Sequence, residues 1–182
     1  MSELTVANRY AKSLVDLAVE KKSLEETRKD MELFTHTLRA NHELQAILAN
    51  PIIPHQKKKN ILEAVFAGKV SKITGAFFKI MVDKSRAQVL YATAKEFINQ
   101  YNVIKHIVKA TVVSAMPLSE DNKKNIIAEL QRATGGTIEL HARVDEKLIG
   151  GFVLTVGDRQ VDTSLSSSLN RLKQDFARGI NR

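Results

Sequence analysis

The stretch DEKLIGGFVLTVGDRQVDTS, residues 145–164, has the most particular order of residues in this chain. A charged turn leads into an apolar run notched by Gly150 and Gly151, and a second polar turn leads into a serine-rich segment. The apolar run predicts a strand over residues 148–156. A glycine pair inside a strand pattern favours a bulge or a close backbone approach over phosphate binding, because no loop-to-helix context surrounds it. This stretch therefore predicts strand and helix packing rather than catalysis.

The residues around this stretch alternate between strand and helix patterns. Residues 107–116 are rich in valine and threonine and predict a strand, and residues 119–133 predict a helix capped by its first residue, a serine. Residues 137–144 alternate, which places Ile138, Leu140, Ala142 and Val144 on one face. Residues 164–178 predict a last helix with an apolar stripe. We therefore expect a small C-terminal α/β domain over residues 106–182.

The N-terminal part has helical periodicity throughout. The expected helices span residues 4–19, 23–40, 42–49, 54–67, 71–84 and 87–104. Ser23 is expected to cap the second helix, and Pro51 limits the third because proline disfavours helix at the residue before it. Six helices with short loops predict an antiparallel bundle over residues 1–105. The expected fold class is thus α+β in two domains, a six-helix bundle followed by a small α/β domain.

Composition limits the possible functions. Hydrophobic residues make up 43% of the 182 residues and charged residues 26%, which is typical of a globular protein rather than a disordered one. The chain has no cysteine, so disulfides and thiolate chemistry are excluded. A net charge of +8 is typical of proteins that bind anionic partners, although the basic residues are spread along this chain. The densest basic run, Lys57 to Lys59, is expected to be a solvated helix face.

Motifs for catalysis, cofactors or membrane insertion are missing from the sequence. There is no P-loop pattern and no nucleophile elbow around the serines near residue 164. The five histidines lack metal-ligand spacing and are expected at the surface. The longest apolar run, 148–156, is far shorter than the roughly 20 residues that span a bilayer. An enzyme is therefore the least supported class, and no cofactor or metal is expected.

Two helices have wider apolar faces than a simple surface helix needs. In the first helix, apolar residues cover about half the circumference. In the fifth helix, Ile73, Phe77, Ile80 and Met81 form one stripe, while Phe78 and Val82 form a second. One interpretation is that both helices are central in the bundle. The other is a groove between them that accepts an amphipathic helix from a partner.

Three segments carry a resemblance to a known family over essentially the whole chain. Residues 7–14 have the order Ala-x-x-Tyr-Ala-x-x-Leu, and Asn50-Pro51 is followed by the segment 57–62. Gly150-Gly151-Phe152 with Asp162-Thr163-Ser164 and the helix after it is the most specific part. These residues resemble the delta subunit family of F-type ATP synthases, the bacterial counterpart of the mitochondrial oligomycin-sensitivity-conferring protein. The six-helix and α/β domains agree with that family's architecture.

The resemblance implies a non-catalytic stator connector, present in one copy per complex. It implies that the bundle binds the N-terminal helix of an alpha subunit in the catalytic head, through the first and fifth helices. The residues placed on that contact are Ala7, Tyr10, Ala11, Leu14, Phe78 and Val82. With this implication added, the groove interpretation is favoured.

The resemblance further implies that the C-terminal domain binds the peripheral-stalk b subunits. The polar face of the last helix, Ser168, Arg171, Lys173 and Asp175, is the expected contact. The protein would work at the cytoplasmic face of the bacterial inner membrane, held there only through the complex, without cofactor or nucleic acid. The competing hypothesis is a basic RNA-binding α/β protein, which the net charge favours and which the sparse aromatics on the expected strands oppose.

Overall fold

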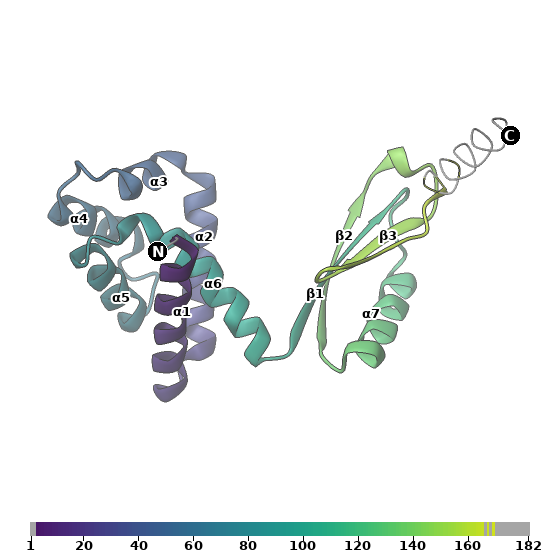
Figure 1. Ribbon diagram of the computed structural model, residues 1–182, viewed down its shortest axis with the longest axis horizontal. Coiled ribbons are helices and arrows are strands. Elements are labelled where there is room, and N and C mark those ends of the chain that lie inside the picture. The colour runs from purple at the N-terminus through teal and green to yellow at the C-terminus, as the bar shows by residue number, and fades with distance from the viewer. Residues whose placement is uncertain (1–2, 166, 168, 170–182) are drawn as a thin grey trace, which may run out of the picture. The chain divides into compact units, whose positions relative to one another are not determined.

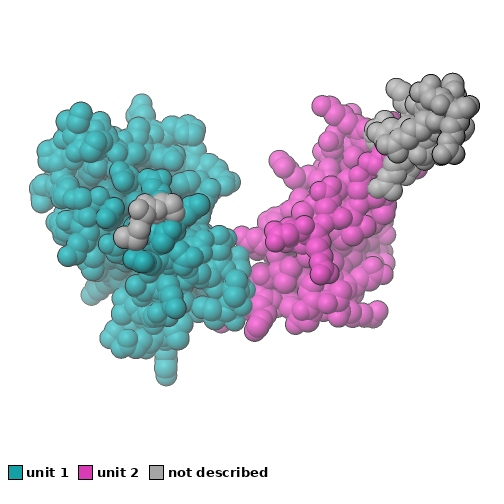
Figure 2. All heavy atoms as spheres, viewed as in Figure 1, with its two compact units in different colours: residues 1–104 teal, residues 105–182 magenta. Residues whose placement is uncertain are grey.

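The computed structural model describes residues 3–165, 167 and 169, and the chain divides into two compact units. Unit 1 comprises residues 1–104 and unit 2 residues 105–182 (Figures 1 and 2). Unit 1 is helical, and the described part of unit 2 contains a four-stranded sheet with one long helix. The α+β class expected from the sequence is therefore confirmed.

The helices of unit 1 begin and end close to their expected positions. They are α1 (Glu3–Glu20), α2 (Leu24–Ala40), α3 (His42–Ala49), α4 (His55–Phe66), α5 (Lys72–Asp83), the 3₁₀ turn η1 (Ala87–Val89) and α6 (Leu90–Ile104). Side chains of Asn41 and Ser71 accept hydrogen bonds from Leu44 N and Thr74 N, at 3.2 and 3.3 Å, and so cap α3 and α5. Ser23 occupies the expected N-cap position of α2, but its hydroxyl makes no capping bond and is buried with no hydrogen-bond partner among the described residues.

The core of unit 1 forms where α6 packs against α1 and α2 and where α4 packs against α5. Three phenyl rings lie at its centre. Phe34 lies 4.5 Å from Phe78 and 5.3 Å from Phe66, measured between ring centroids. A buried carboxylate, Asp30, accepts hydrogen bonds from Ser71 N and Thr74 Oγ1 and so holds the start of α5 against α2. Aromatic packing and this long-range cap fix α5 in the bundle.

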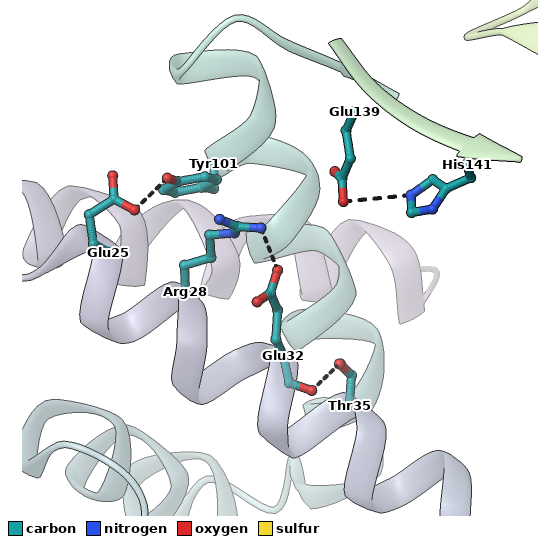
Figure 3. Close-up of polar contacts among 7 residues, drawn as sticks. All are labelled: Glu25, Arg28, Glu32, Thr35, Tyr101, Glu139 and His141. Carbon is teal, nitrogen blue, oxygen red and sulfur yellow. Dashed lines mark hydrogen bonds and ion pairs between the residues drawn. The ribbon is translucent and has the colours of Figure 1, made fainter. Parts of the chain in front are cut away.

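A second polar cluster joins α2 to the end of α6 (Figure 3). The Tyr101 hydroxyl donates to Glu25 at 2.6 Å, and the Arg28 guanidinium lies 5.0 Å from the Tyr101 ring centroid. Arg28 also pairs with Glu32 at 2.7 Å, one turn further along α2. Burial first, and then the hydrogen bond and charge of Glu25, raise the pKa of Tyr101 above its ordinary value. The phenol therefore stays protonated while it joins the two helices.

Unit 2 is a β-α-β unit extended by a hairpin. Its elements are β1 (Ile107–Ser114), α7 (Glu120–Thr134), β2 (Thr137–Val144), the 3₁₀ turn η2 (Glu146–Leu148), β3 (Phe152–Val156) and β4 (Arg159–Asp162). The strand order is β2-β1-β3-β4. The β1–β2 pair is parallel and the other two pairs are antiparallel, so α7 is the crossover connection that a parallel pair requires. Ser119 caps α7 as expected.

The segment 145–164 folds differently from the expectation in two places. The strand expected over 148–156 begins only at Phe152, because residues 146–148 form η2. The polar turn expected after it contains a further strand, β4, which closes a hairpin with β3. The expected close approach at the glycine pair is confirmed, since Gly151 has φ +76° and a Cβ there would collide with the Thr163 carbonyl.

The expectation that the lysine run is a solvated face is wrong for Lys58. Its side chain is buried, with 5% of the residue exposed, and its ammonium donates to the Leu48 carbonyl at 2.8 Å. Burial lowers the pKa of Lys58. Lys57 is exposed, and Lys59 forms an ion pair with Asp83. The last helix expected over 164–178 lies largely outside the described residues.

Candidate partner-binding surfaces

The six residues placed on the expected head contact lie mostly inside unit 1. Ala7, Ala11 and Leu14 on α1 are at most 1% exposed. On α5, Phe78 is 3% exposed and Val82 is fully buried. Tyr10 is half-buried and packs against the same core. In the isolated chain the five buried side chains pack the helices against one another. Of the six, Tyr10 is the residue whose surface is accessible to a partner.

The accessible stripe of α5 is the other one. Ile80 is 53% exposed and Ile73 is half-buried, whereas Phe77 is 9% exposed. These residues are spaced four and three apart, so they share one face of α5. On the neighbouring face, Phe78 lies in the phenyl cluster, and Val82 lines a cavity together with residues at the start of α4. In the sequence these three residues form the first apolar stripe together with Met81, which is fully buried, whereas the resemblance placed the contact on the second stripe.

The free side of α1 can be located from its packing on α6. The Asn8 side chain, which is exposed, accepts a hydrogen bond from Gln100 of α6 at 3.0 Å, so α6 approaches α1 along the edge that carries Asn8. Tyr10 and Leu17 are about 200° and 180° around the helix from Asn8, at 100° per residue. Leu17 is 39% exposed. Both α1 and α5 also pack on α2 and on η1. Tyr10 and Leu17 thus lie on the side of α1 opposite Asn8, whereas Leu4, 74% exposed, and Val19, 51% exposed, lie on the same side as Asn8.

A groove of about 480 Å³ separates α4 from α5. Its lining includes Leu62, Phe66, Val70 and Gly75, and a Cβ at Gly75 would meet no atom within 4 Å. Lys79 of α5 and Glu63 of α4 pair across its rim at 2.6 Å, and the hydrogen bond and charge of Lys79 lower the pKa of Glu63. An ion pair between exposed side chains contributes little stability. This ion pair therefore holds the rim of the groove only weakly.

Unit 2 leaves part of an apolar sheet face uncovered. The register places Val144, Ala142 and Leu154 on the same face as buried Val112, with Val161 on that face in β4. Val144 is 52% exposed and Val161 55%. Helix α7 contacts β2, yet none of its residues is buried. This exposed end of the face is a candidate partner surface.

The residues expected to contact the stalk, Ser168, Arg171, Lys173 and Asp175, lie outside the described residues. The structure does explain the motif that precedes them. Asp162 accepts hydrogen bonds from Ser164 N at 2.9 Å and from Ser167 Oγ at 2.6 Å. The Ser164 hydroxyl in turn accepts from Ser167 N at 3.3 Å, in the manner of an N-cap. Serine and aspartate here therefore build a helix start, as the sequence predicted.

Two other features bear on the remaining functional classes. In the described part of the chain, no group of three or more histidines, aspartates and glutamates could hold a metal ion. No described helix is both long and apolar enough to cross a membrane. The polar sheet face carries Lys109, His141 and Arg143, all exposed. Its described strand residues include no aromatic ring on which a base could stack.

Comparison with known proteins assigns the chain to a family. The model of the ATP synthase delta (OSCP) subunit family matches residues 6–176. The ATP synthase subunit delta of Cytophaga hutchinsonii is 37% identical over 99% of this chain and 98% of its own, and that of Chlorobaculum tepidum is 35% identical over 97% of both. A chain of the Toxoplasma gondii mitochondrial ATP synthase hexamer superposes with a TM-score of 0.70 at 26% identity, covering 94% of this chain and 97% of that one. The chain therefore belongs to the ATP synthase delta (OSCP) subunit family.

Proposed function

We propose that this protein is a non-catalytic connector in the stator of a proton-translocating F-type ATP synthase. The observation that carries the proposal is similarity to delta subunits over nearly the full length of both chains. Two compact units, each with an accessible apolar surface, suit a protein that joins two partners. One copy would link the catalytic head to the peripheral stalk and be held at the cytoplasmic face of the bacterial inner membrane through the complex.

Unit 1 would bind the N-terminal helix of an alpha subunit. An amphipathic helix needs an apolar groove with anchors at helical spacing. We place the direct contacts on the accessible stripes, with Tyr10 on α1 and Ile73 and Ile80 on α5. The buried members of the expected set would shape the groove from beneath. They are Ala7, Ala11, Leu14, Phe78 and Val82.

Unit 2 would bind the b subunits of the peripheral stalk. The uncovered sheet face around Val144 and Val161 supplies apolar area. The polar residues Ser168, Arg171, Lys173 and Asp175 would add a second contact from the last helix. In this arrangement the protein breaks no bond and binds no nucleotide. It resists torque because two separate surfaces bind two separate stator parts, so the head stays fixed while the rotor turns.

Calorimetric titration of the full chain with a peptide of the alpha subunit's N-terminus from the same source tests the head contact. One-to-one saturable binding is expected. Ile80→Asp should weaken it at least tenfold, because a carboxylate would be buried against the apolar face of the peptide. Ile52→Asp is the matched control, since Ile52 is 87% exposed and lies outside both helices. It should leave the affinity unchanged.

Tyr10→Asp extends the test to α1 and should also weaken binding while the amide spectrum of unit 2 stays the same. Absence of peptide binding by the folded wild-type protein would refute the head contact. Equal losses from Ile80→Asp and Ile52→Asp would instead refute the placement on α5. Binding to generic RNA that falls steeply with salt would favour the competing hypothesis.

A further inference from the structure

A small cavity of about 250 Å³ lies where α3 ends, α4 begins and α5 ends, next to η1. Polar side chains from three of these segments line it, together with apolar walls. The lining residues are Leu48, Ala49, Pro51, His55, Lys58, Val82, Ser85, Ala87 and Gln88. We call it the Lys58 pocket. It is separate from the accessible stripe of α5 and from the α4–α5 groove.

The pocket contains a buried cation without a carboxylate partner. The Lys58 ammonium can donate three hydrogen bonds. It makes one, to the Leu48 carbonyl, and within the described part of the chain it forms no ion pair. Removing an ammonium group from water is costly unless its charge and its donors are satisfied. The carbonyl at the end of α3 compensates part of this cost, so the site still favours an added negative charge.

The start of α4 adds to the same positive field. Helix N-termini carry partial positive charge and are normally followed by acidic residues or capped by a side chain. Here Pro54 occupies the cap position without a side-chain bond, and the first turn contains no acidic residue. It contains His55, Lys57 and Lys58 instead. The nearby carboxylate of Asp83 forms its ion pair with Lys59, in the next turn. The uncapped helix start and the buried ammonium in its first turn thus both favour an anion.

The remaining lining sets the chemistry of that anion. Ser85 Oγ lies 3.4 Å from His55 Nε2, and the Gln88 amide lies at the exposed edge. Both residues line the same pocket as Lys58 and have neutral groups that can donate hydrogen bonds. Leu48, Pro51 and Val82 line the rest with apolar surface. A carboxylate on a short hydrocarbon fits both the donors and the apolar wall, whereas a fully hydrated phosphate would leave the wall unused.

We propose that the Lys58 pocket is a carboxylate-binding site, with the Lys58 ammonium as its anchor and Ser85 and Gln88 as further donors. The carboxylate would be carried on a short aliphatic chain, either as a free acid or as a glutamate side chain. This site shares Val82 with the buried residues proposed to shape the alpha-subunit groove, but it includes none of the direct contacts Tyr10, Ile73 and Ile80.

Amide NMR of the full chain during titration with sodium propionate tests the proposal, with sodium chloride at equal ionic strength as reference. Saturable shifts are expected at residues 48–58 and 82–88, with a Kd of about 1 to 10 mM for so small a ligand. Shifts that chloride reproduces, or that spread over the lysines of both units without saturation, would overturn it.

Lys58→Met should weaken propionate binding at least tenfold, and Lys57→Met is the matched control. Both remove one charge from the first turn of α4, but Lys57 is exposed and outside the pocket. Equal weakening by the two variants would show a general field effect and contradict the site.

If Lys58→Met fails to fold, Ser85→Gly replaces it. Ser85 has φ +59°, a conformation that suits glycine, so this variant should fold and bind about threefold more weakly. Unchanged affinity in Ser85→Gly would remove Ser85 from the site and overturn the proposed donor set.

The two carriers of the carboxylate can be separated with a second probe, N-acetyl-glutamate amide, compared with N-acetyl-glutamine amide. Saturable binding of the glutamate compound at the same residues supports a side-chain ligand. Binding of propionate alone supports a free acid. Equal binding of the glutamine compound would contradict recognition of a carboxylate.

Discussion

The two units differ in how much of their apolar surface they bury themselves. In unit 1, large side chains from different helices are fully buried, including Phe34, Phe97 and Met81. In the described part of unit 2, the buried hydrophobic residues are Ala110, Val112 and Ile138, and α7 contributes none. Unit 1 therefore has a core of its own, whereas unit 2 leaves apolar strand residues in contact with water.

This difference teaches where each unit's stability comes from. Stability from burial scales with the apolar area removed from water, at roughly 25 cal/mol per Å². Because the core of unit 2 is thin, strand pairing and turn geometry supply a larger share of its stability than they do in unit 1. Covering its exposed sheet face with a partner would add the missing burial. We infer that unit 1 presents a rigid surface, while unit 2 gains stability when it binds.

The largest expected effect comes from the centre of the unit 1 core. Phe34→Ala should lower the free energy of unfolding of unit 1 by about 3 to 5 kcal/mol, because it empties the middle of the phenyl cluster. Urea unfolding followed separately at the amide peaks of α2 and β1 measures it. The α2 midpoint should fall and the β1 midpoint should stay. A parallel fall of both midpoints would contradict two separate cores.

In unit 2, a backbone position should matter more than a core side chain. Gly151→Ala should cost about 2 to 4 kcal/mol, because alanine is strained at φ +76° and its Cβ would push the Thr163 carbonyl away from β3. Gly157→Ala is the matched control. Gly157 also has positive φ but has open space around it, so about 1 kcal/mol is expected. The midpoints of the β1 amide peaks in urea compare the two, and equal costs would show that the close approach is unimportant.

Most of the fold could be predicted because it rests on local signals. Helical periodicity, the cap at Ser119 and the limit set by Pro51 predict the helices within a few residues. The strand β4 was missed because its residues, Arg-Gln-Val-Asp, lack the apolar alternation of a half-buried strand. Its partner β3 defines it as a strand, and pairing of that kind is not a local property.

The candidate sites were less predictable, because burial depends on neighbours that periodicity cannot identify. Phe78 and Ile80 are both apolar residues of α5, yet one is in the core and the other faces water. Lys58 looked like its two neighbours in sequence, and only the end of α3 gives it a buried partner ten residues away. A charged residue buried by a tertiary contact leaves no pattern in a single sequence.

A smaller effect is expected from pH on unit 1. The raised pKa of Tyr101 means that the folded state holds the phenol proton more tightly than the unfolded state. This stabilisation is fully present below the ordinary pKa near 10 and is lost as pH rises through the higher folded value. Tyr101→Phe should cost about 1 kcal/mol at neutral pH, through loss of the Glu25 bond, and should flatten the decline above about pH 10.

Urea unfolding of α2 amide peaks at several pH values measures the Tyr101 contribution as the difference between variant and wild type. Unit 2 contains no tyrosine, so the pH dependence of its unfolding serves as an internal reference that includes no tyrosine ionisation. An identical pH dependence in variant and wild type would show that Tyr101 is not coupled to the folding of unit 1.

The smallest effect on stability is expected at the exposed sheet face, where the effect on binding should be the clearest. Val144→Ser removes a half-exposed side chain and should change the free energy of unfolding by less than about 0.5 kcal/mol. Fluorescence anisotropy with a labelled b-subunit segment should nevertheless show about threefold to tenfold weaker binding, because the valine would be buried in that complex. His141→Ser is the control on the opposite face of β2, and its affinity should match wild type. Equal binding by all three proteins would show that the stalk does not cover Val144 at the exposed apolar face of unit 2.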